Sequence, residues 1–183
     1  MTQEMSEIRT AVDCLRRHDP HHREYYDRNR ENIIQKIQRL GDVTRIECPE
    51  NATTHRGRKA DLFIATSTRR YVIEVKLCLS TSASLGRHLL RKAKDTLSLF
   101  NEQDAALLVA VDSSKIDNAC EELKTRLRRM FTKGFRIDVG DVICTPSTLV
   151  EGMPYISIRF KRASEALKVL KQFGVTEIGI LPL

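Results

Sequence analysis

The sequence predicts a single mixed α/β domain built on a central sheet. Three observations lead to this fold class. Residues 105–112, AALLVAVD, form a continuous apolar run of strand length, which is typical of a strand buried on both faces of a sheet. Residues 71–77, YVIEVKL, are rich in β-branched side chains and alternate in polarity, which also indicates a strand. Around these runs lie segments whose apolar residues recur at helical spacing.

The first part of the chain is expected to supply two helices and three strands. Apolar residues one helical turn apart predict a short helix over residues 6–17, and the polar residues 18–30 indicate a connector. Asn29 is placed to cap a second helix that ends before Gly41. The three strands are expected at residues 43–48, 60–65 and 71–77.

The second part continues the alternation of helices and strands. We expect helices at residues 84–100, 114–133 and 163–173, and strands at residues 105–112, 136–144, 155–160 and 175–181. The predicted organisation is an N-terminal helical arm and connector (1–28), a core (29–150) and a C-terminal strand–helix–strand extension packed on that core (151–183).

Composition and charge limit the classes of function. A chain of 183 residues with 41% hydrophobic and 30% charged residues is long enough for one core and is not expected to be disordered. The net charge of +7 and the pI of about 9.3 favour a polyanionic partner, because Lys and Arg release counterions from phosphates. Aromatic residues are scarce, at 5% with no Trp, so backbone contacts to a duplex or junction fit better than base stacking.

The sequence also bears on compartment. No run approaches the roughly 20 apolar residues of a membrane helix, and the start MTQEMSEIRT does not have the regions of a signal peptide. We therefore expect a cytoplasmic protein without a membrane partner. The five cysteines are odd in number and widely spread, which favours buried thiols over a disulfide framework or a structural zinc site.

One group of residues carries a chemical pattern. Glu74 and Lys76 lie on the same face of a predicted strand, because side chains alternate along a strand. A hairpin with the preceding strand would bring Asp61 beside them. Two carboxylates at a sheet edge suit Mg²⁺ or Mn²⁺, and the backbone carbonyl of Val75 is a further candidate ligand. Such an ion would stabilise charge on a phosphate while Lys76 orients or deprotonates the attacking water.

These residues resemble a known signature. The segment GRKADLFIATSTRRYVIEVKL resembles the motif of the PD-(D/E)XK nuclease superfamily, which includes many restriction enzymes and archaeal Holliday junction resolvases. The family motif is an acidic residue, a variable gap, then Asp or Glu, any residue and Lys; here these are Asp61, Glu74, Val75 and Lys76. The resemblance covers somewhat less than half of the chain. It implies a restriction-endonuclease-like core of helix, three strands, helix and strand, and a metal-dependent DNA endonuclease.

The resemblance has one further match and two departures. In the resolvase branch a Glu near the start of the first core helix faces the metal, and Glu31 stands at that place; alternatively, Glu31 is only a favourable acid in a first helical turn. The Pro that usually precedes the first Asp is Ala60 here. The Gln-x-x-x-Tyr pattern of the exonuclease-like branch is absent from the helix after Lys76.

Basic residues surround the motif in sequence and are candidates for phosphate contacts. The residues proposed to bind nucleic acid are Arg58, Lys59, Arg69, Arg87, Arg91 and Lys92. The basic run at residues 124–133 is interpreted instead as a solvated helix face. His18, His21 and His22 have no second set of ligands nearby in sequence, and they are interpreted as solvated residues rather than a metal cluster.

The predicted function is metal-dependent hydrolysis of phosphodiester bonds in DNA, with an endonuclease favoured and a homodimer possible. The alternative from another class is a catalytically silent nucleic-acid-binding module or assembly subunit with the same fold. RNA as the substrate is also compatible with the sequence. Neither a Gly-rich phosphate loop nor a nucleophile elbow is present.

Overall fold

The computed structural model is an α/β domain and describes residues 3–49, 59–77, 85–136, 139–146, 154–160 and 163–183. Its strands are β1 (Val43–Glu47), β2 (Leu62–Thr66), β3 (Arg70–Val75), β4 (Ala105–Val111), β5 (Val139–Pro146), β6 (Pro154–Phe160) and β7 (Val175–Pro182). Its α-helices are α1 (Gln3–His18), α2 (Arg23–Arg28), α3 (Arg30–Gln38), α4 (Leu85–Leu99), α5 (Ile116–Arg129) and α6 (Ala163–Gln172). The α/β class predicted from the sequence is confirmed.

The strands form one mixed sheet in the order β1-β2-β3-β4-β7-β6-β5. The pairs β1–β2 and β2–β3 are antiparallel, β3–β4 and β4–β7 are parallel, and β7–β6 and β6–β5 are antiparallel. Strand β4 therefore lies in the middle of the sheet, and all seven of its residues are buried, as its continuous apolar run predicts. Strand β7, from the end of the chain, completes the parallel centre rather than an edge.

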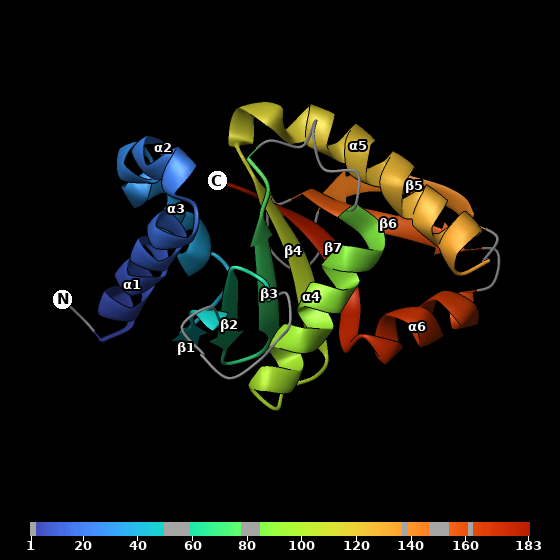
Figure 1. Cartoon of the computed structure of the whole chain (residues 1–183), viewed down its shortest axis with the longest axis horizontal. Coiled ribbons are helices and arrows are strands. Elements are labelled where there is room, and N and C mark those ends of the chain that lie inside the picture. The colour runs from blue at the N-terminus through green and yellow to red at the C-terminus, as the bar shows by residue number, and fades with distance from the viewer. Residues whose placement is uncertain (1–2, 50–58, 78–84, 137–138, 147–153, 161–162) are drawn as a thin grey trace.

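Helices cover both faces of the sheet (Figure 1). Helices α1, α2 and α3 pack on one face in a cluster that includes Leu62, Ile64 and Ile73. Helices α4, α5 and α6 pack on the other face, where the cluster includes Phe63 and Val72. The alternation of side chains along β2 and β3 thus divides their apolar residues between two cores.

The N-terminal helix belongs to this packing. The buried residues of α1 include Ile8, Val12 and Leu15, at helical spacing, and all three are at most 3% exposed. The connector expected at residues 18–30 contains structure of its own: a 3-10 turn, η1 (Pro20–His22), and helix α2. Pro20 ends the regular turns of α1 because it cannot donate a backbone hydrogen bond.

The C-terminal strands continue the same sheet. Strand β5, assigned from the sequence to the core segment, pairs in the described residues with β6 and lies at the far edge of the sheet. A division at residue 150 falls between these two paired strands. The long helix expected at residues 114–133 is a 3-10 turn, η4 (Ser113–Lys115), then α5, then a π-helical turn, η5 (Met130–Gly134).

The cysteines correct one sequence interpretation. Cys14 on α1 and Cys48, which follows β1, are joined as a disulfide with Cα atoms 6.1 Å apart. Thirty-four positions separate them in sequence, but α1 packs directly against β1 and β2. Wide spacing along the chain was therefore a poor guide to pairing. Among the described helices, none is both long and apolar enough to cross a membrane.

Truncation of a buried leucine on α5 tests the packing. Leu123 is fully buried, and we expect Leu123→Ala to lower the free energy of unfolding by about 2–5 kcal/mol in urea titrations. Leu167 on α6 is 60% exposed and provides the matched control. We expect Leu167→Ala to change the free energy by no more than about 0.5 kcal/mol. Equal effects of the two substitutions would contradict the described core.

Candidate functional site

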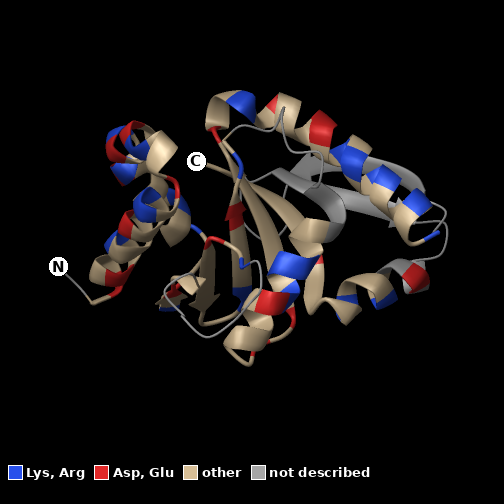
Figure 2. Ribbon diagram, viewed as in Figure 1, with Lys and Arg blue, Asp and Glu red and all other residues tan. Residues whose placement is uncertain are grey.

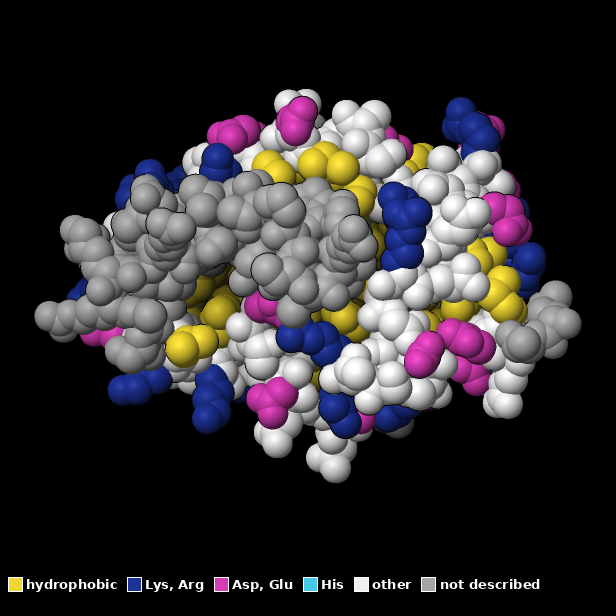
Figure 3. All heavy atoms as spheres, turned by 180° about the vertical axis from the view of Figure 1, so that it is seen from behind, with side chains coloured by type: hydrophobic (Ala, Val, Ile, Leu, Met, Phe, Trp, Pro, Cys, Tyr) yellow, Lys and Arg dark blue, Asp and Glu magenta, His cyan; other side chains and the backbone are white. Residues whose placement is uncertain are grey.

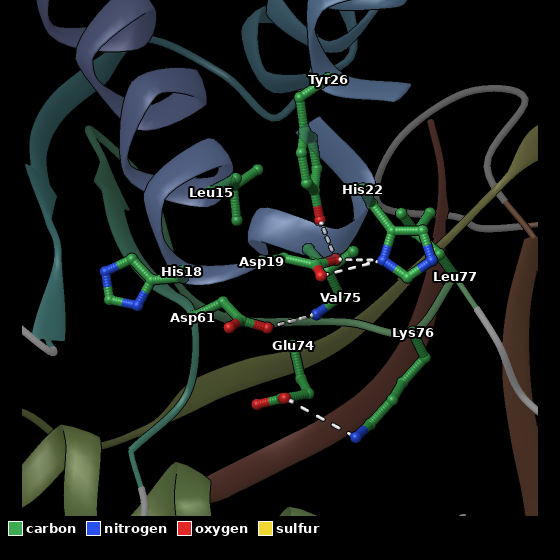
Figure 4. A pocket seen from close by; sticks show the side chains of 10 residues that line it. All are labelled: Leu15, His18, Asp19, His22, Tyr26, Asp61, Glu74, Val75, Lys76 and Leu77. Atoms are coloured by element: carbon green, nitrogen blue, oxygen red, sulfur yellow. Dashed lines mark hydrogen bonds and ion pairs between the residues drawn. The ribbon is translucent and has the colours of Figure 1, made fainter. Parts of the chain in front are cut away.

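The pairing of β2 with β3 places the two acidic residues of the motif side by side. Leu62 pairs with Ile73 in antiparallel register, so Asp61, one residue before β2, lies next to Glu74 near the end of β3. The Asp61 carboxylate is held there, because its Oδ2 accepts a hydrogen bond of 2.8 Å from the backbone N–H of Val75 (Figure 4). The predicted proximity of Asp61 to the Glu74–Lys76 segment is thus present in the structure.

Glu74 is a buried carboxylate with basic neighbours. It is 4% exposed and projects from the same face of β3 as Val72, toward α4. The Nζ of Lys92 on α4 lies 2.9 Å from its Oε1, and the Nζ of Lys76 lies 3.8 Å from the same oxygen. The other oxygen, Oε2, is buried and has no hydrogen-bond partner among the described residues.

This environment changes the acidity of Glu74. Burial, the largest cause, and the negative charge of Asp61 raise the pKa of its carboxyl from about 4.5 to about 7. Lys92 and Lys76 oppose the rise but do not cancel it. Ionisation of Glu74 therefore costs more free energy than that of an exposed carboxyl, and a further positive charge nearby would lower this cost.

A buried hydrogen bond joins helix α4 to the segment just before β2 that carries Asp61. The hydroxyl of the fully buried Thr96 accepts a 2.9 Å hydrogen bond from the backbone N–H of Ala60. It also donates to the carbonyl of Lys92, one turn earlier, at 2.7 Å. One threonine thus fixes the residue before Asp61 against the turn of α4 that carries Lys92.

The acidic pair opens into a pocket of about 250 Å³ between the end of β3 and the turn that follows α1. Its lining comprises Leu15, His18, Asp19, His22, Tyr26, Asp61, Glu74, Val75, Lys76 and Leu77 (Figure 4). The wall opposite β3 is polar: the carboxylate of Asp19 accepts from Tyr26 Oη at 3.0 Å and lies 2.8–2.9 Å from His22 Nδ1. The pocket thus combines carboxylates, an ammonium group and two imidazoles.

Sequence interpretation missed this opposite wall. The segment expected to be a polar connector contains Asp19, His22 and Tyr26. Its histidines are predicted from the sequence to be solvated. The spacing Asp-x-x-His-x-x-x-Tyr was the available signal, since positions three and four apart meet on helical turns. Whether these three side chains point toward the motif depends on how α1 packs on the sheet. The local sequence does not determine that packing.

Several predicted site residues lie elsewhere. Glu31 is outside the pocket: its side chain is 68% exposed and lies 3.6 Å from Arg9 in an ion pair. Arg69 precedes β3, at the opposite end from Glu74, and pairs with Glu177 on β7. Arg91 is exposed on α4, and Lys59 lies two residues before Asp61. Arg58 and the side chain of Arg87 lie outside the described residues.

Described basic residues on α4 and α5 are interspersed with acidic ones (Figure 2). Figure 2 shows Lys and Arg along α5 and on α4, with acidic residues between them. On α5, Lys124 and Arg126 pair with Glu121 and Glu122, as expected for a solvated helix face. The reverse side of the molecule also shows described basic and acidic side chains interspersed (Figure 3).

The donor set can be compared with the needs of a divalent cation. Within the described part of the chain, no group of three or more His, Cys, Asp or Glu side chains is arranged to hold a metal ion. Mg²⁺ is nevertheless often bound through one or two carboxylates, with phosphate oxygens and water completing its shell. Asp61 and the buried Oε2 of Glu74, which no described residue hydrogen-bonds, fit that need, because a nearby cation would satisfy both charge and coordination.

Comparisons with known proteins add nothing to this geometry. No protein-family model, curated protein or solved structure matches the chain. The pocket itself is therefore the basis for assigning a function.

The raised pKa of Glu74 has a measurable consequence for stability. A carboxyl with a higher pKa in the folded state contributes stability below about pH 4.5 that is lost as the pH rises through about 7. In EDTA we expect wild type to lose on the order of 3 kcal/mol over that range relative to Glu74→Gln. Urea unfolding at pH 4.5, 6 and 8 measures the difference.

The matched control is Glu121→Gln, whose side chain is 75% exposed on α5. We expect its free energy of unfolding to follow wild type at all three pH values. If the difference between wild type and Glu74→Gln did not vary with pH, the raised pKa would be refuted.

Proposed function

We propose that this chain is a metal-dependent nuclease that hydrolyses phosphodiester bonds in DNA. The observation that carries the proposal is the convergence of Asp61, Glu74 and Lys76 in one pocket, where Oε2 of Glu74 is buried and has no hydrogen-bond partner in the described part of the chain. A buried, unpaired carboxylate oxygen is costly for a fold to maintain, so its presence favours a functional role.

Asp61, Glu74 and the backbone carbonyl of Val75 are the groups that would hold the ion. The hydrogen bond from Val75 N–H fixes the Asp61 carboxylate, and the β2–β3 pairing fixes its position relative to Glu74. Lys92 occupies Oε1 of Glu74 and keeps that carboxylate oriented while Oε2 remains for the ion. When bound, Mg²⁺ or Mn²⁺ would stabilise negative charge on the scissile phosphate and lower the pKa of water.

Lys76 supplies positive charge on the lining of the pocket, next to Glu74. Its ammonium lies 3.8 Å from Glu74 Oε1, and its side chain is 25% exposed on the pocket lining. A phosphate group entering the pocket would meet this ammonium, which is a compact charge with three hydrogen-bond donors. We assign Lys76 to holding the phosphate and orienting the attacking water.

The architecture around the pocket supports a restriction-endonuclease-like core. A helix, three antiparallel strands, a helix and a parallel strand follow one another from α3 to β4. This order is the one that the resemblance to the PD-(D/E)XK superfamily implies. The net charge of +7 suits a DNA backbone as the partner.

Cleavage of a DNA panel (linear, supercoiled, branched and single-stranded) in Mg²⁺, Mn²⁺ or EDTA tests the proposal. We expect metal-dependent cleavage by wild type. Asp61→Asn and Lys76→Met should each lower the rate about 100-fold or more, because each removes charge that stabilises the transition state. We also expect Mn²⁺ to raise the melting temperature of wild type more than that of Asp61→Asn, since the ion binds the folded state.

A protein that binds the panel without cutting it, and whose variants bind equally well, would instead be a catalytically silent nucleic-acid-binding module. Cleavage that persists in EDTA, or an Asp61→Asn variant as active as wild type, would contradict the metal site. An RNA panel run in parallel would establish the preference between the two nucleic acids.

Glu31 gives a separate prediction. Because its side chain is exposed and paired with Arg9 outside the pocket, we expect Glu31→Gln to retain cleavage within about threefold of wild type. The measurement is the same cleavage assay. A loss as large as that of Asp61→Asn would mean that Glu31 reaches the ion in the working enzyme.

A further inference from the structure

The polar wall opposite β3 contains an ordered histidine. His22 Nδ1 lies 2.9 and 2.8 Å from the two carboxylate oxygens of Asp19. Asp19 is itself held by the hydroxyl of Tyr26, which is buried within the α1–α3 layer at 1% exposure. The imidazole therefore has a fixed orientation in which Nδ1 carries a proton toward Asp19.

His22 shares the pocket with the proposed metal ligands and is accessible from it. Its side chain is 35% exposed, so a water molecule in the pocket can reach the ring. The titratable groups that line the pocket together with His22 are His18 at the end of α1, Asp19 just after it, Tyr26 on α2, Asp61 before β2, Glu74 on β3 and Lys76 just after β3 (Figure 4).

Lys76 is poorly placed to accept a proton. Its ammonium forms an ion pair with Glu74, and an ammonium group has three donors and no acceptor. Lys92 is bound to the same oxygen and has the same limitation. In a neutral imidazole whose Nδ1 carries the proton, by contrast, Nε2 has a lone pair that can accept one. Histidine is also the commonest general base in enzymes.

We propose that His22 is the general base of the nuclease reaction and that Asp19 is its positioning residue. The inference rests on the proposed nuclease function. Nε2 of His22 takes a proton from the attacking water, whose oxygen forms a new bond to phosphorus. The bond from phosphorus to the leaving oxygen breaks, and that oxygen takes a proton from solvent. The imidazolium that forms is stabilised by the Asp19 carboxylate and later returns its proton to water.

Asp19 fits a positioning role better than that of a metal ligand. Its Oδ2 accepts from Tyr26 and faces His22, and its Oδ1 also faces Nδ1 of His22. Both oxygens are therefore already engaged within their own wall of the pocket. Tyr26 Oη shares this arrangement, and burial together with the nearby Asp19 carboxylate raises the pKa of the tyrosine, so it remains a hydrogen-bond donor.

The first test compares His22 with its neighbour in sequence. With DNA in Mg²⁺, we expect His22→Ala and His22→Gln to lower kcat about 100- to 10,000-fold. Binding of DNA in Ca²⁺, measured by fluorescence anisotropy, should change less than threefold. Added imidazole should restore part of the His22→Ala rate. His21 is exposed and lies outside the pocket, so His21→Ala should match wild type in all three measurements.

The second test has a readout that a merely structural role would not change. The kcat of wild type should rise with pH and then level, because only neutral His22 accepts a proton, and this rise should disappear in His22→Gln. In the metal-free protein, ¹⁵N NMR should show His22 with its proton on Nδ1. The Asp19→Asn variant should lose this tautomer while its melting temperature reports whether the fold is intact.

The outcomes separate the two proposals. If wild type and His22→Ala cleave equally while Asp61→Asn is inactive, the nuclease function stands and the general base is refuted. If His22→Ala loses DNA binding in Ca²⁺ as strongly as it loses cleavage, His22 binds phosphate and is not the base. If wild type cuts no DNA with any metal, both proposals fail.

Discussion

The burial of the Glu74 carboxylate at the end of β3 is the constraint around which this molecule is organised. An ionised group with 4% exposure is unfavourable unless charges and hydrogen bonds compensate it. Lys92 supplies one such charge from α4, and Lys76 supplies another from the strand itself. The compensation is incomplete, because Oε2 remains unpaired among the described residues and the pKa is raised to about 7. A bound cation would complete it.

The rest of the sheet makes this burial possible. Strand β3 lies between an antiparallel pair on one side and the parallel strands β4 and β7 on the other. Both of its faces are covered by helices, so its end is enclosed rather than exposed at an edge. The backbone ladder continues beyond β3, where the N–H of Lys76 donates to Ala110 on β4 at 2.8 Å. That bond holds Lys76 in line with Glu74 on the pocket side.

Both helical layers contribute side chains to the surroundings of the acidic pair. From one layer α4 reaches Glu74 through Lys92, and from the other the turn after α1 brings Asp19 and His22 to face the same carboxylates. Two walls with different chemistry result: carboxylates and an ammonium group on the strand side, and imidazole, carboxylate and phenol groups on the helix side. The proposed hydrolysis would use both walls, the first to hold an ion and the second to accept a proton.

Local patterns were sufficient for much of this structure. Period-two alternation placed Glu74 and Lys76 together, and a continuous apolar run identified β4, because these signals depend only on neighbouring residues. Contacts between distant segments required the tertiary structure. The Lys92–Glu74 ion pair, the Arg69–Glu177 pair, the Cys14–Cys48 disulfide and the approach of His22 to the acidic residues all join separate elements. Sequence spacing carries no information on such distances, since they are set by how α1 and α4 pack on opposite faces of the sheet and by the order of its strands.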